Sequence, residues 1–166
     1  MKNGILIGVV IMGILVIFFF GDFSSKNHEE QEFLAFQQFL NDEFFPISND
    51  CFDHLNQAVD ELYAFTFSDW YFNGDGRDEN GILQSDLEQI EDDVLLYEIK
   101  YNQALALKKN ILNQIESLKE TLQLLSNAPS EEDEKSFERF RLKLITMIDI
   151  LSTEMDEMNK LLESNQ

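Results

Sequence analysis

The chain has 166 residues, and its 32 Asp and Glu against 12 Lys and Arg give a formal net charge of −20. A field of that sign repels phosphates, so the sequence excludes nucleic-acid binding. Only two prolines and seven glycines are present, which favours a few long helices over many strands.

An apolar run at residues 4–21 is the first predicted element. Its 18 residues carry no charge, and Ile, Val and Phe cover every face of a helix built from them. At 1.5 Å per residue, that helix is about 27 Å long, close to the hydrocarbon thickness of a bilayer. We therefore expect residues 1–23 to form a single-pass transmembrane anchor.

The flanks of the apolar run give the anchor a direction. Lys2 precedes it, and an acidic stretch that begins at Asp22 follows it. By the positive-inside rule, the N-terminus stays in the cytoplasm and residues 24–166 lie on the extracytoplasmic side, periplasmic or at the cell surface. A cleaved signal peptide is the alternative, although Phe19 and Phe23 stand where cleavage needs small residues.

Residues 24–166 are predicted to form one helical domain. Asn27 is the expected N-cap of a first helix, which ends at Pro46 because the residue before a proline avoids helical geometry. A second helix starts just after Pro46, and its apolar stripe runs on through Phe65. Both helices are therefore expected to be amphipathic and to lie on either side of a chain reversal.

An aromatic segment and a loop come next. Residues 63–72 hold six aromatic side chains within ten positions, which favours packing in the core or beneath a loop, with a contact patch for a membrane interface or a protein partner as the alternative. Residues 73–81 are rich in Gly, Asp and Asn and predict a loop.

Two long helices are predicted to complete the chain as an antiparallel coiled-coil hairpin. The first spans residues 86–125, where apolar side chains alternate at spacings of three and four, and only Lys108 interrupts the seam. The second spans residues 131–163 with a similar seam. The link between them, residues 126–130, is short enough to require antiparallel packing.

The predicted fold is therefore all-α: an N-terminal transmembrane helix followed by an elongated four-helix bundle, closed within one chain or between two copies. The longer hairpin projects beyond the first pair of helices. If the first helix leaves the membrane and the second returns, residues 73–85 lie near the bilayer and residues 126–130 form the distal tip.

Motifs that could carry chemistry are weak. A calcium loop around Asp78, Asn80 and Gly81 fails because Gly76 and Leu87 fall at positions that need carboxylates.

Two further pairs, His28 with Glu32 and Asp50 with His54, share helix faces at a spacing of four, but two histidines fall short of a bundle metal site. Cys51, the single cysteine, is expected to be a buried free thiol, with an intermolecular disulfide as the alternative. We assign no catalytic, cofactor-binding or metal-ligating residue, and expect no enzyme.

The function expected from these features is that of a membrane-anchored scaffold. An acidic helical domain, held by one span, presents its surface to protein partners, including basic ones, and a homo-oligomer is a further option. The general plan resembles membrane-tethered helical and coiled-coil subunits of bacterial envelopes. The alternatives are an extracytoplasmic ligand-binding sensor that acts through a partner, and a tethered inhibitor or immunity-type protein.

Overall fold

The computed structural model describes residues 28–164, which are helical apart from short connections and contain no strand. The elements are α1 (His28–Phe39), the π-helix η1 (Leu40–Phe44), α2 (Phe45–Ala64), α3 (Phe67–Tyr71), α4 (Gly76–Leu96), α5 (Asn102–Ser126) and α6 (Glu134–Ser164). Among these residues no helix has both the length and the hydropathy needed to cross a bilayer. The expected anchor, residues 1–23, lies outside the described range.

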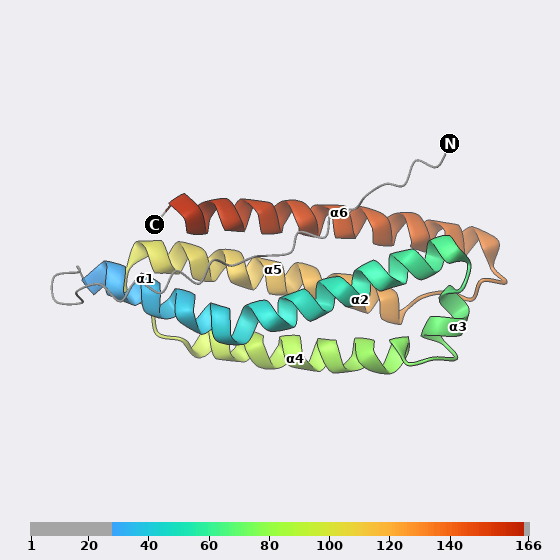
Figure 1. Cartoon of the computed structure of the whole chain (residues 1–166), viewed down its shortest axis with the longest axis horizontal. Helices are drawn as coiled ribbons and strands as arrows, with labels where there is room; N and C mark the ends of the chain where they lie inside the picture. Colours follow the sequence, from blue (N-terminus) through green and yellow to red (C-terminus); the bar gives the residue numbers. More distant parts are fainter. Residues whose placement is uncertain (1–27, 165–166) are drawn as a thin grey trace.

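The expected chain reversal at Pro46 is wrong, because α1, η1 and α2 follow one another without a break (Figure 1). Pro46 lies in the first turn of α2, where a missing N–H costs little. The π-helical turn before it widens the hydrogen-bond ladder, and the Phe45 N–H bonds to the carbonyl of Leu40. The proline is thus accommodated inside a continuous helical segment.

The chain reverses instead around α3. Phe65 ends α2 in the left-handed region, at φ 60° and ψ 33°, and α3 follows as a helix of five residues. The predicted loop at residues 73–81 is too long, because α4 already begins at Gly76. Gly76 packs against Trp70 so closely that a Cβ there would lie 2.6 Å from the indole Cε2.

The predicted single helix over residues 86–125 is also wrong, because α4 ends at Leu96 and α5 begins at Asn102. Tertiary contacts stabilise the connection. The carboxylate of Glu32 in α1 accepts hydrogen bonds from the backbone N–H groups of Lys100, at 3.0 Å, and Tyr101, at 2.8 Å. Lys108, which interrupted the predicted seam, donates from Nζ to the carbonyls of Leu95 and Tyr97, each at 2.9 Å. The positive charge of Lys108 near the C-terminus of α4 also interacts favourably with the negative end of the helix dipole.

The long helices lie alongside one another, with α5 in contact with α1, α2, α4 and α6 (Figure 1). Residues from all of these helices, together with α3, form one buried hydrophobic cluster. An ion pair between Lys119 of α5 and Glu91 of α4, at 2.6 Å, ties that pair together at the surface. Because α5 has neighbours on several sides, its apolar surface extends beyond a single stripe, as its sequence indicates.

The molecule has two distinct ends. The proximal end holds the start of α1 and the α4–α5 connection, which Glu32 joins (Figure 1). The distal end holds α3 and the α5–α6 connection, where the Ser68 N–H donates to the Glu131 carboxylate at 3.1 Å. The expectation that residues 73–85 and residues 126–130 lie at opposite ends of the molecule is therefore wrong, because Asn80 and Gln84 each donate to the Ser126 hydroxyl at 2.8 Å.

Candidate functional site

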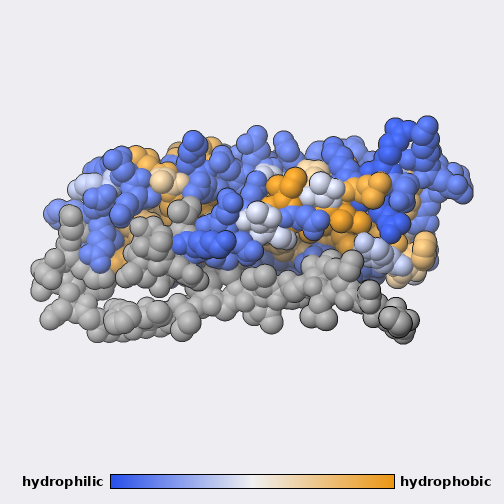
Figure 2. Space-filling view, turned by 90° about the horizontal axis from the view of Figure 1, so that it is seen from above, coloured by the Kyte–Doolittle hydropathy of each residue, from blue (hydrophilic) through white to orange (hydrophobic). Residues whose placement is uncertain are grey.

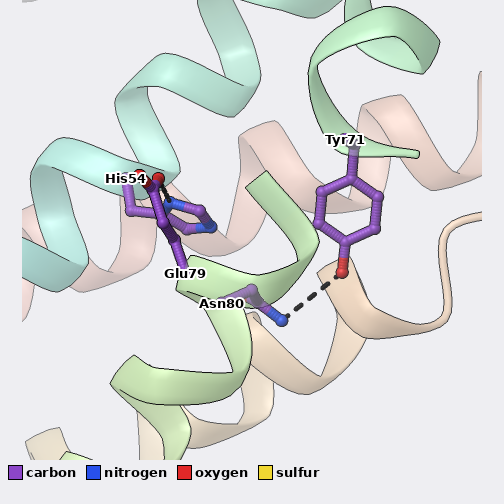
Figure 3. A network of polar contacts seen from close by, with 4 residues as sticks. All are labelled: His54, Tyr71, Glu79 and Asn80. Atoms are coloured by element: carbon purple, nitrogen blue, oxygen red, sulfur yellow. Dashed lines mark hydrogen bonds and ion pairs between the residues drawn. The ribbon is translucent and has the colours of Figure 1, made fainter. Parts of the chain in front are cut away.

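The polar side chains that the structure brings together lie where α2, α3 and α4 meet. Figure 3 shows His54 from α2, Tyr71 from α3, and Glu79 and Asn80 from α4. The two α4 residues are adjacent in sequence and face different partners: Glu79 pairs with His54, and Asn80 reaches towards Tyr71. We treat this junction as the candidate site.

His54 occupies a buried position in the junction, with 5% of its surface exposed. Its Nδ1 lies 3.5 Å from Oε2 of Glu79, and its ring packs 5.1 Å from the Trp70 ring. Its Nε2 is buried and has no hydrogen-bond partner among the described residues. Burial lowers the pKa of His54 below the usual value of 6.5, and Glu79 only partly opposes this effect.

The lowered pKa of His54 predicts a pH dependence of stability. Unfolded histidine binds a proton more readily, so the stability that neutral His54 provides is fully present above about pH 6.5 and declines as the pH falls below it. In urea unfolding measured at neutral and at mildly acidic pH, His54→Gln is therefore expected to lose less stability on acidification than the unmodified chain.

His28→Gln is the matched control for this measurement, because it removes the other histidine, which is exposed. That variant is expected to keep the pH dependence of the unmodified chain. An identical pH dependence in His54→Gln and the unmodified chain would contradict the assignment.

Asn80 forms the second half of the junction and is almost fully buried. Its Nδ2 donates to Oγ of Ser126 at 2.8 Å and to the Leu122 carbonyl at 3.1 Å, with Oη of Tyr71 at 3.5 Å. Burial raises the pKa of Tyr71 above its usual value of 10, and the hydrogen bonds with Ser126 and Asn80 only partly oppose this effect. The network joins α3, α4 and α5, and buried networks of this kind hold helices in one arrangement.

A shallow surface hollow of about 300 Å³ adjoins His54. Carboxylates and an amide line it together with two aliphatic side chains: Asp50, Asp53, Gln57, Glu79, Ile82 and Leu83 surround His54. Such a surface attracts cationic groups in general. Within residues 28–164, His, Cys, Asp and Glu side chains form no cluster of three or more that could hold a metal ion.

The structure places the sequence-derived candidates differently from their predicted pairing. His54 pairs with Glu79, and Asp50 lies on the rim of the hollow instead. Glu32 binds the α4–α5 connection. Asp78 and Asn80, considered as calcium ligands, lie within helix α4.

The prediction for Cys51 is confirmed: it is a free, fully buried thiol. Burial raises its pKa to about 12, with Asp50 and Asp86 adding to the effect. The alternative, an intermolecular disulfide, would require this thiol to reach the surface.

Apolar side chains that are exposed to solvent are a separate feature of the surface. Figure 2, which looks onto the molecule from the α6 side, shows hydrophobic residues interrupting a mostly hydrophilic face. Among the α6 side chains that the structure describes, Leu142 and Ile150 are large, apolar and exposed. At the distal end, Phe65 is 88% exposed, Tyr63 50% and Phe72 41%.

The aromatic segment at residues 63–72 thus divides into two parts. Phe67 and Tyr71 are fully buried, whereas Phe65 and its exposed neighbours face outward. Sequence reasoning could not separate them, because the backbone turns at Phe65 and breaks the helical periodicity on which such a division depends. The Asn80 network was missed for a related reason, since its partners Leu122 and Ser126 lie more than 40 residues away.

Comparison of the chain with protein-family models, with curated proteins and with solved structures finds no match in any of the three.

Proposed function

We propose that the chain is a membrane-anchored, non-enzymatic interaction protein of a cell envelope. In this proposal, residues 1–23 span the membrane with the N-terminus in the cytoplasm. The helices of residues 24–166 form a four-helix bundle on the extracytoplasmic side and present it to a protein partner. The observation that carries the proposal is the exposed, left-handed Phe65 at the distal end.

Phe65 combines two unfavourable features. A left-handed conformation costs a residue with a side chain roughly 1–2 kcal/mol, and the position that ends a helix in this way is usually glycine. An aromatic side chain that is 88% exposed also gains little from burial. Residues held in such conformations are concentrated at functional sites, which supports a binding role for Phe65.

The backbone around Phe65 explains why the conformation is kept. The N–H groups of Phe65 and Thr66 both bond to the carbonyl of Glu61, the second at 3.0 Å, which closes the end of α2. Tyr63, two residues earlier in the chain, contacts Arg141, whose guanidinium carbon is 5.0 Å from the Tyr63 ring centroid. The backbone at Phe65 and the ring of Tyr63 are therefore each held by contacts within the chain.

The position and charge of this surface favour a particular kind of partner. An anchor that precedes His28 attaches to the proximal end, so Phe65 faces away from the membrane. Asp69, Glu131 and Glu132 also belong to the distal end, where α3 and the α5–α6 connection meet. The carboxylates here outnumber the cations, which include Arg141 on the Tyr63 ring. An exposed aromatic side chain in such a setting fits an apolar pocket with a basic rim.

Substituting Phe65 separates binding from stability. In Phe65→Gly, we expect the free energy of unfolding to stay constant or rise by up to about 1 kcal/mol, because glycine adopts the left-handed conformation without strain. In-cell crosslinking and pull-down from detergent-solubilised membranes should recover a protein partner with the unmodified chain and lose it with Phe65→Gly.

Leu96→Ala is the matched control, since Leu96 is also highly exposed but lies at the proximal end. It is expected to retain the partner. Equal recovery of a partner by Phe65→Gly and by the unmodified chain would overturn the proposed role of the distal end.

A further inference from the structure

A second, smaller hollow lies between α5 and α6, away from the junction of α2, α3 and α4. It has a volume of about 190 Å³ and is lined by Asn110, Asn113, Gln114, Glu154, Glu157 and Met158. Five of these six side chains carry an amide or carboxylate oxygen, and none is cationic. The lining is therefore rich in hydrogen-bond acceptors, and the two glutamates give it a negative charge.

Two of the lining side chains present buried acceptors with no partner. Gln114, from α5, is only 3% exposed, and its Oε1 makes no hydrogen bond to any described residue. Oε2 of Glu154, from α6, is also buried and also has no hydrogen-bond partner among the described residues. Leaving such a group unpaired costs about 1–3 kcal/mol, and more for a charged one, so the two oxygens favour a ligand that donates hydrogen bonds.

The neighbours of Gln114 do not meet this need. Its Nε2 faces Sδ of Met155 on α6, and the adjacent positions Ile111, Ile115 and Leu118 are fully buried apolar residues. A glutamine among these residues is not explained by helix packing, for which a leucine would serve better. The polar side chain is explained if the hollow has an occupant.

We propose that the hollow between α5 and α6 binds a small primary alkylammonium ion. An ammonium group has three N–H donors and one positive charge, which suit the Gln114 and Glu154 oxygens together with the Glu157 carboxylate. The Met158 side chain gives the alkyl chain an apolar contact. The volume is many times the roughly 10–15 Å³ that one water needs, so there is room for an organic cation.

The acceptor groups that line the hollow favour an alkylammonium ion over a metal ion or a neutral alcohol. A divalent metal ion would prefer several carboxylates around one point, and residues 28–164 contain no group of three or more His, Cys, Asp or Glu side chains placed to hold a metal ion. A neutral alcohol would satisfy one acceptor but leave the carboxylates uncompensated. This inference adds a ligand site to the interaction protein and does not depend on the distal end.

The test is isothermal titration calorimetry with the full 166-residue chain in a mild detergent, at an ionic strength of about 0.15 M to screen the overall acidic field. The probe is n-butylammonium chloride. We expect saturable one-site binding in the millimolar range, as ligand efficiency allows for so small a molecule. Tetramethylammonium, which has charge but no N–H donor, and 1-butanol, which has no charge, are expected to bind at least tenfold more weakly.

Variants locate the site. Glu154→Gln and Gln114→Leu are each expected to weaken butylammonium binding about tenfold or more, because each removes one acceptor. Glu138→Gln, a surface change on the same helix outside the hollow, should leave binding unchanged. Glu154 is partly exposed, so its variant tests the site independently of any change that Gln114→Leu makes in the packing of α5.

A lysine side chain of another protein carries the same ammonium group, and Nα-acetyl-lysine amide distinguishes that source. Tighter binding of the lysine derivative identifies a protein side chain as the occupant, and tighter binding of butylammonium identifies a free amine; either result supports the site. Absence of saturable binding, binding unaffected by Glu154→Gln and Gln114→Leu, or binding of CaCl₂ in place of the amine would overturn it.

Discussion

Replacing Phe67 with Ala is expected to lower the free energy of unfolding by about 3–5 kcal/mol, the usual range for a buried phenylalanine. Phe67 is fully buried in α3, and its ring lies within 6.1 Å of the rings of Trp70, Tyr71, Phe72, Phe137 and Phe140. A helix of five residues has no stability of its own, so α3 depends on this packing. Urea unfolding followed by far-ultraviolet circular dichroism measures the change.

Phe72→Ala is the matched control for Phe67→Ala. Phe72 belongs to the same aromatic group but is 41% exposed, so its truncation should cost clearly less. Because Phe67 also joins α3 to α6 through Phe137 and Phe140, its loss should loosen the distal end as well as the core. A loss of less than about 1 kcal/mol for Phe67→Ala would contradict the packing described for α3.

The second large effect is expected at Asn80. In Asn80→Leu, the buried acceptors on Leu122, Ser126 and Tyr71 lose a shared donor, and the free energy of unfolding should fall by about 2–3 kcal/mol. Leucine has a similar size, so the loss reports the hydrogen bonds more than the volume. The same denaturation experiment applies.

Gln84→Leu is the control for Asn80→Leu, because Gln84 contributes a single hydrogen bond to this network, donating to the same Ser126 hydroxyl at 2.8 Å. Its cost should be about 1 kcal/mol, the value for a single hydrogen bond. In a double-mutant cycle, Asn80→Leu combined with Ser126→Ala should cost less than the sum of the two single changes. Strict additivity would contradict a shared network.

The helical class could be predicted because it rests on local features. Few prolines and glycines, and apolar residues at helical spacing, are properties of short stretches of chain. The break between Leu96 and Asn102 could not be predicted in this way, because residues 97–101 include no glycine or proline and the apolar spacing continues across them. The break is stabilised by Glu32, which lies 68 residues before Lys100.

At Pro46 and Gly76 the sequence contains a local signal for the end of a helix, but no helix terminates at either residue in the structure. Both are residues that commonly end helices, yet Pro46 lies in the first turn of α2 and Gly76 is the first residue of α4. A proline is tolerated where its N–H is not needed, and the glycine is required by the indole of Trp70. Lys108 was the one local signal of the break, since a cation in an apolar seam needs a polar partner.

The sequence could identify single residues of the candidate site but not the contacts between them. His54 could be recognised as a titratable group on a helix face, but its partner Glu79 comes from α4 and not from the preceding turn of α2. Gln114 carried no signal of function, because a glutamine beside an apolar stripe is ordinary on a helix surface. Its significance appears only when α6 covers it.

Site-specific photo-crosslinking in intact cells tests the central proposal most directly. A photoreactive amino acid is placed at Phe65 on the distal end in one chain and at Leu96 on the proximal end in another, since both positions are highly exposed. Illumination is expected to yield a discrete adduct with one protein from position 65 and none from position 96. No adduct from position 65, or the same adducts from both positions, would contradict the distal end as the partner-binding surface.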